Sequence, residues 1–155
     1  AQQLNSPIKD LEKKIEQALE QSKKLEKQLK DLQQSQAAST AKELAAQAET
    51  SGAVPFIAAN LGSVDGNFAQ AVTDSLKGQF EGVVVLGAAG NGTVALVASV
   101  PDSLTDKAQA GRIIQSIAPI VGGKGGGKPT QARGGGKDAT KLDEALAEVP
   151  KILAR

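Results

Sequence analysis

The chain has 155 residues and a net charge of +1 at pH 7, and it contains no cysteine, histidine, tyrosine, tryptophan or methionine. Without cysteine and histidine it lacks disulfides, the usual zinc ligands and nucleophile–histidine pairs. We therefore expect no catalytic residue, no metal site and no cofactor. No apolar run reaches the roughly 20 residues that cross a bilayer, and the polar start of the chain is unlike a signal peptide. These features predict a cytoplasmic protein that does not contact membranes.

A heptad pattern dominates residues 1–52. Ser6 and Pro7 form a helix-start signal and Gly52 a stop signal, and apolar residues recur between them at spacings of three and four. An unbroken helix of this length would extend over roughly 65 Å. Its apolar stripe therefore needs a partner, either a second copy of the chain or a segment folded back after a break near 37–40. The predicted dimer seam consists of Ile8, Leu11, Ile15, Leu25, Leu29 and Leu32.

Residues 53–155 alternate between strand and helix signals, which predicts a globular α/β domain with a mixed sheet. The Gly90-Asn91-Gly92 sequence is a hairpin signal. The predicted fold class is α+β or α/β: a long coiled-coil-like N-terminal helical subdomain, then a small mixed-sheet globular domain with flanking helices. We expect strands at 54–61, 82–86, 93–100 and 129–132, and helices at 65–80, 106–118 and 138–153.

Positive charge is concentrated between residues 107 and 137, which include no aspartate or glutamate. The run at 121–137, VGGKGGGKPTQARGGGK, combines eight glycines with lysine and arginine. Consecutive free glycine N–H groups flanked by cations favour an anion site, and phosphate fits such a site well. Two alternatives stay open: a flexible linker, and glycines that serve close packing only. The linker is less favoured because both flanking segments belong to one patterned core.

Nucleic acid is the expected anion. Residues 122–128 match G-x-x-x-x-G-K, but Pro129 follows where a nucleotide-binding loop needs Ser or Thr and a helix start. The only aromatic residues are Phe56, Phe68 and Phe80, all on apolar faces, so no stacking platform for single strands is predicted. Recognition would then rest on phosphates and on the shape of a structured RNA.

The run at 121–136 resembles the glycine-rich signature of the C-terminal domain (C-Ala) of alanyl-tRNA synthetase. Segments at 44–48 (LAAQA), 82–88 (GVVVLGA), 93–100 (TVALVASV) and 107–121 (KAQAGRIIQSIAPIV) agree with that family in kind and order. The resemblance implies a helical subdomain and a globular α/β subdomain that binds the elbow of tRNA(Ala), helps link aminoacylation with editing, and can mediate dimerisation. The implied partners are tRNA(Ala) and the catalytic and editing domains of the parent synthetase.

On this resemblance the chain is a non-catalytic tRNA-binding domain of an aminoacyl-tRNA ligase. One alternative is a coiled-coil oligomerisation module. Another is the substrate-binding C-terminal domain of an oligonucleotide phosphoesterase, whose glycine signature usually includes a histidine that this chain lacks. The family usually has Ala-Gly-Gly where this chain has Arg133-Gly134-Gly135, which makes the segment more basic. The predicted RNA-binding residues are Arg112, Lys124, Gly125, Gly126, Gly127, Lys128, Gln131, Arg133 and Lys137.

Overall fold

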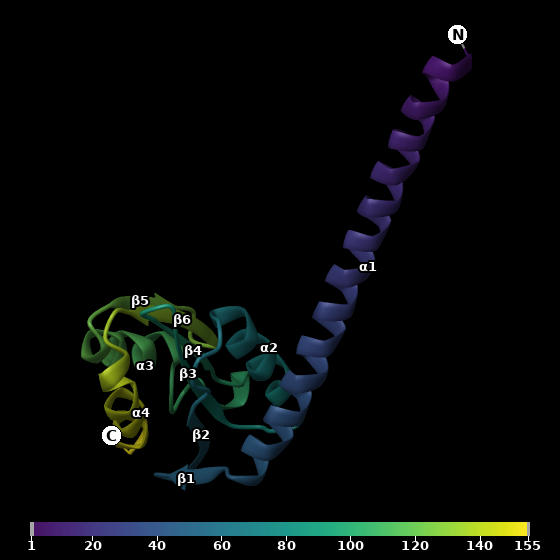
Figure 1. Ribbon diagram of the computed structural model, residues 1–155. Helices are drawn as coiled ribbons and strands as arrows, with labels where there is room; N and C mark the ends of the chain where they lie inside the picture. The colour runs from purple at the N-terminus through teal and green to yellow at the C-terminus, as the bar shows by residue number, and fades with distance from the viewer. Residues whose placement is uncertain (1, 155) are drawn as a thin grey trace. The chain divides into compact units, whose positions relative to one another are not determined.

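The computed structural model describes the backbone of residues 2–154 and the side chains of residues 9–154. The chain divides into two compact units, Ala1–Ser35 and Gln36–Arg155. The first unit is helical, and the second holds a six-stranded mixed sheet with helices on both faces (Figure 1). The predicted fold class is therefore confirmed. The division lies N-terminal to the boundary that the sequence indicates after residue 52. Among the described residues, no helix has the length and apolar character needed to cross a membrane.

Helix α1 (Gln2–Ala46) is continuous, so the alternative of a break near 37–40 is wrong. The helix begins before Ser6 and Pro7, because capping preferences worth about 1 kcal/mol are local and do not fix a helix end. The seam side chains from Leu11 onward are exposed, whereas the side chain of Ile8 lies outside the described residues.

The predicted stop of this helix at Gly52 is also wrong. Residues beyond Ala46 leave the helix and form a short strand, β1 (Glu49–Ser51), which pairs antiparallel with β2 (Val54–Asn60). Gly52 and Ala53 make the turn between these strands with φ of 58° and 69°. Sheet pairing of the polar segment at 49–51 thus overrides its helical pattern.

The sheet has the strand order β1-β2-β3-β4-β6-β5. Only β2 and β3 run parallel, and every other neighbouring pair is antiparallel. The predicted hairpin turn is confirmed: Asn91 and Gly92 both have positive φ, and Gly90 pairs with Thr93. The remaining strands are β3 (Val83–Gly90), β4 (Thr93–Ser99), β5 (Lys124–Gly127) and β6 (Gln131–Gly136).

Helix α2 (Gly66–Lys77) covers one face of the sheet over β3 and β4. The carboxylate of Asp65 caps the helix by accepting a hydrogen bond of 2.8 Å from the N–H of Phe68. Val72 and Leu76 are fully buried, as their spacing of four predicts. Two alanines of α1 that belong to the second unit, Ala37 and Ala41, complete the apolar cluster on this face.

Helices α3 (Ala110–Ile117) and α4 (Leu142–Leu153) cover the opposite face (Figure 1). Ile113, Ile114 and Ile117 of α3 are all buried, as their spacing of three and four along a helix predicts. The helix is shorter than predicted, since it begins only at Ala110 and a 3-10 turn occupies 118–121. Leu142 of α4 packs onto Gly87 of β3, where an added Cβ would lie 2.4 Å from a leucine methyl group.

Asp138 caps the 3-10 turn that leads into α4. Its Oδ1 accepts hydrogen bonds from the N–H and the hydroxyl of Thr140, and these bonds hold the pKa of the carboxyl below its ordinary value. A depressed carboxyl pKa stabilises the fold above the unfolded pKa, and this contribution disappears as pH falls through the folded pKa. We expect Asp138→Ala to lower the Tm at pH 7, and the difference from wild type to shrink below about pH 3.9. Thermal melts between pH 2.5 and 7 check this, and a pH-independent difference would contradict it.

Candidate nucleic-acid interface

The glycine-rich segment folds as a β-hairpin of β5 and β6 at one edge of the sheet (Figure 1). The predicted single strand at 129–132 is wrong, because Pro129 and Thr130 form the hairpin turn. The N–H of Lys128 donates a 2.8 Å hydrogen bond to the carbonyl of Gln131 across that turn. Glycine is rare in strands, so residue propensities do not predict β5 and β6, which consist mostly of glycine.

Close backbone packing requires several of these glycines. A Cβ on Gly125 would lie 2.4 Å from both the Cα of Gly134 and a methyl group of Ile114. A Cβ on Gly123 would lie 1.6 Å from the carbonyl oxygen of Gly135. Helix α3 therefore packs so closely on the hairpin that a side chain larger than that of glycine at position 125 would clash with it. Gly123 and Gly125 therefore serve close packing, which is one of the two alternatives that the sequence leaves open.

The predicted run of free glycine N–H groups is interrupted at Gly126. Antiparallel pairing alternates, so the bond between Lys128 and Gln131 also directs the N–H of Gly126 toward β6, whereas the N–H groups of Gly125 and Gly127 point away from β6. At the N-terminus of α3, the N–H groups of Ala110 and Gly111 donate to the carbonyls of Pro129 and Lys128 at 2.8 and 3.2 Å. The hairpin therefore presents no consecutive run of free N–H groups, and an anion there would meet exposed cationic side chains and only alternate glycine N–H groups.

The hairpin face on the α2 side of the sheet is open, and we call Lys124, Gly126, Arg133 and Gly135 the open hairpin face. The register pairs Lys124 with Gly135 and Gly126 with Arg133, so all four residues share one face. An added Cβ on Gly126 would meet only the side chain of Gln115, and one on Gly135 only the carbonyl oxygen of Val94. Beside Lys124 and Arg133 the surface is therefore low, since Gly126 has only the exposed Gln115 side chain of α3 near it and Gly135 only a backbone oxygen.

The cations of this region have no acidic partners within the part of the chain that the structure describes. The two ion pairs found there are Lys77 with Asp74 at 3.7 Å and Lys151 with Glu148 at 2.9 Å. An unpaired cluster of exposed cations attracts anions, because nothing nearby neutralises its field. The exposed cations of the predicted site are Arg112, Lys124, Lys128, Arg133 and Lys137.

The structure brings some of the predicted residues together and separates others. Lys124 and Arg133 are diagonal neighbours on β5 and β6, within reach of adjacent phosphates. Lys128 lies at the hairpin turn and Lys137 follows β6. Arg112 belongs to α3, which packs on the opposite face, so it is not part of the open hairpin face.

Gln131 is half-buried and lines a groove with a volume of about 650 Å³, between the C-terminal end of α2 and the end of β4. Lys77 and Phe80 line the same groove. Within the described residues, no group of three or more acidic side chains is placed to hold a metal ion.

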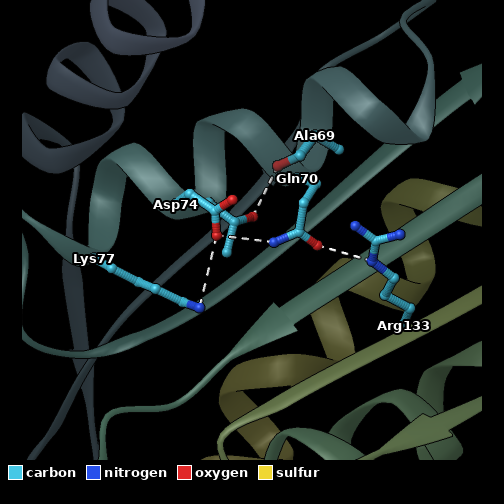
Figure 2. A network of polar contacts seen from close by, with 6 residues as sticks. Ala69, Gln70, Asp74, Lys77 and Arg133 are labelled. Atoms are coloured by element: carbon cyan, nitrogen blue, oxygen red, sulfur yellow. Dashed lines mark hydrogen bonds and ion pairs between the residues drawn. The ribbon is translucent and has the colours of Figure 1, made fainter. Parts of the chain in front are cut away.

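Arg133 is anchored by a polar network that the sequence does not reveal (Figure 2). Its Nε donates a 2.8 Å hydrogen bond to Oε1 of Gln70 on α2, and Nε2 of Gln70 donates to Asp74 at 2.9 Å. Lys77 lies 3.7 Å from the same carboxylate. Gln70 occupies an ordinary polar position of an amphipathic helix, so no sequence signal distinguishes it before the fold is known.

A family model described as the DHHA1 domain matches residues 53–155. This chain belongs to the DHHA1 domain family. The DHHA1 chain is 39% identical to the alanine–tRNA ligase of Hydrogenovibrio crunogenus over 155 residues, which are 99% of this chain and 18% of that protein. It is 42% identical to the Pseudomonas fluorescens enzyme of the same name over 135 residues, 86% of this chain and 15% of that protein. It therefore spans less than a fifth of the length of these relatives.

The fold of this DHHA1 chain is similar to that of the C-Ala domain of Aquifex aeolicus alanyl-tRNA synthetase. The TM-score is 0.64 at 25% sequence identity, covering 70% of this chain and 98% of that domain. The predicted kinship with alanyl-tRNA synthetase is thus confirmed, and so is the expectation of a domain that is not itself catalytic. These matches do not favour the phosphoesterase alternative.

Proposed function

We propose that this DHHA1 chain is the tRNA-binding C-Ala part of an alanine–tRNA ligase and that the open hairpin face, with Lys128 and Lys137, contacts tRNA phosphates. The observation that carries the proposal is the set of exposed cations without acidic partners on a flat glycine surface. The names of the relatives support tRNA as the nucleic acid. Glycines 126 and 135 carry no side chain, so a sugar–phosphate backbone can approach the sheet closely.

The proposed ligand is the elbow of tRNA(Ala), recognised by shape and phosphates. The three phenylalanines are buried or partly buried, so stacking on splayed bases contributes little. Phosphate contacts position an RNA without reading its sequence. Holding the elbow keeps the tRNA bound while its acceptor end moves between the aminoacylation and editing centres of the parent enzyme. Such a role places the protein in the cytoplasm, where tRNA is charged.

The experiment is a titration of labelled tRNA(Ala), a second tRNA and an RNA duplex of equal length, at several salt concentrations. We expect both tRNAs to bind more tightly than the duplex. Lys124→Ala with Lys128→Ala should weaken tRNA binding about tenfold, at roughly 0.7 kcal/mol for each exposed charge contact. It should also lower the slope of log K against log salt by about 2.

A matched double variant, Lys42→Ala with Lys151→Ala, removes the same charge from outside the hairpin. Both lysines are exposed, and the partner of Lys151 is a surface carboxylate at 2.9 Å. This variant should keep the wild-type slope, and neither variant should change the Tm by more than a degree or two. Equal losses for the two double variants would mean that net charge, rather than the hairpin, binds the RNA.

We also propose that the seam of α1 joins two copies of the chain. Leu11, Ile15, Leu25, Leu29 and Leu32 are each more than half exposed in the single chain. Exposed leucines at heptad spacing are typical of a coiled coil that lacks its partner. Dimerisation and RNA binding use different residues, so the two functions are compatible.

A further inference from the structure

We infer that Gln70 is a positioning residue for RNA binding: it fixes Arg133 so that the outer edge of the guanidinium group faces one RNA phosphate. This inference rests on the proposed function. The observation behind it is the hydrogen bond of 2.8 Å from Arg133 Nε to Gln70 Oε1, which joins β6 to α2 across 63 positions of sequence (Figure 2). Gln70 itself touches no phosphate in this arrangement.

The surroundings of Arg133 make Gln70 its anchor. The cross-strand neighbour on β5 is Gly126 and the next residue of β6 on the same face is Gly135, and neither has a side chain to restrain the arginine. The neighbour on β4 is Val97, whose apolar side chain offers no hydrogen-bond acceptor. Nε makes the hydrogen bond to Gln70, and among the described residues the two terminal nitrogens of the guanidinium donate to no protein group. Those two nitrogens form the fork that binds phosphate oxygens in pairs.

Asp74 determines which way the amide of Gln70 points. A glutamine amide can present either its oxygen or its nitrogen to a neighbour, and only the oxygen can accept a bond from Arg133. Gln70 Nε2 donates to Asp74 at 2.9 Å, so the amide oxygen is left facing the arginine. Lys77, 3.7 Å from Asp74, partly neutralises a carboxylate that would otherwise repel RNA.

Anchoring favours binding because a free arginine loses side-chain freedom when it grips a phosphate. An arginine already held at Nε has lost much of that freedom before the RNA arrives. We expect Gln70→Ala to weaken tRNA binding about fivefold, within the range that ordering one long side chain allows. The substitution alters no charge, so the loss cannot come from Coulombic attraction alone.

The test is a double-mutant cycle on tRNA(Ala) affinity with Gln70→Ala, Arg133→Ala and the combined variant, using Gln79→Ala as the control. Gln79 is an exposed glutamine just beyond α2 whose amide, among the residues that the structure describes, bonds only to Ser75. We expect Gln70→Ala to keep the wild-type salt slope, Arg133→Ala to lower it by about 1, and Gln70→Ala to have no further effect once Arg133 is removed. Gln79→Ala should bind as wild type.

A second comparison separates positioning from charge. Asp74→Asn and Asp74→Ala remove the same negative charge, but only asparagine retains an oxygen that can accept from Gln70. We expect the alanine variant to bind tRNA about threefold more weakly than the asparagine variant. In the absence of RNA, the NMR signal of the Arg133 Nε–H should shift and broaden in Gln70→Ala and not in Gln79→Ala.

The outcomes distinguish the two proposals. If Arg133→Ala weakens binding while Gln70→Ala does not, the positioning role is overturned and the proposed function stands. If Gln70→Ala weakens binding equally with and without Arg133, the two residues are uncoupled and the inference is again overturned. If Arg133→Ala and the Lys124–Lys128 double variant both bind as wild type, the proposed function fails at the hairpin and this inference fails with it.

Discussion

Replacing Gly125 by alanine should destabilise the protein by about 2–3 kcal/mol, while the same change at Gly126 should be almost neutral. The two positions are adjacent in β5, so both substitutions add one methyl group to the same glycine-rich strand. What differs is the face to which the methyl group points. Residue 125 faces the side covered by α3, and residue 126 belongs to the open hairpin face.

The steric difference is large. At position 125 the new Cβ would lie 2.4 Å from the backbone of Gly134 and from a buried methyl group of Ile114, and neither can move without shifting the sheet or α3. At position 126 the nearest atom would be the end of the exposed Gln115 side chain at 3.3 Å, which can rotate away. Alanine also reduces the backbone freedom of the unfolded chain, which offsets the small clash at 126.

Thermal and urea unfolding of the two variants check this prediction. A loss of about 2–3 kcal/mol corresponds to a fall in Tm of roughly 10 °C for Gly125→Ala. Similar stability for both variants would show that Ile114 of α3 does not pack closely against Gly125, and would contradict the prediction. Gly126→Ala has a further use, because its methyl group stands beside Arg133 on the open hairpin face. A stable Gly126→Ala protein with weakened tRNA binding would support close approach of the RNA backbone there.

Periodicity predicts the core of this protein well and its edges poorly. Spacing alone identifies Ile113, Ile114 and Ile117 as the buried face of α3 and Leu142 as a contact of α4, since burial repeats with the helical period. The hairpin turn at Asn91 and Gly92 is equally local, because positive φ selects those residue types. Such features follow from a few neighbouring residues, and they are confirmed.

Features that depend on distant pairing are not predicted. The segment at 49–51 continues a helical pattern, and only its bonds to β2 make it a strand. The glycines of β5 and β6 carry no strand signal, because their role is to leave room for Ile114 and for one another. Composition locates the basic segment correctly, but it does not show which cations share a face, and it cannot show Gln70 beside Arg133.

The second large effect concerns the α1 seam, where substitution of Leu25 and Leu29 by alanine should abolish self-association. Burying a leucine side chain contributes about 1.5–3 kcal/mol, and a two-stranded coiled coil buries each position twice. Removing both leucines therefore raises the dimer Kd by at least about a thousandfold, since 1.4 kcal/mol is tenfold. Sedimentation velocity over a hundredfold concentration range measures the change.

Leu19 provides the matched control for this prediction. It is 58% exposed in the single chain, compared with 53% for Leu25 and 59% for Leu29, so exposure alone does not separate the three. Heptad spacing does separate them, because Leu25 and Leu29 lie in the a/d seam whereas Leu19 lies on its flank. Leu19→Ala should accordingly weaken the dimer by less than tenfold. If Leu19→Ala weakens association as much as Leu25→Ala, the copies associate through a general apolar surface and not through the heptad seam. If the wild-type chain stays monomeric at all concentrations, the proposed dimer is wrong and the seam binds a different protein.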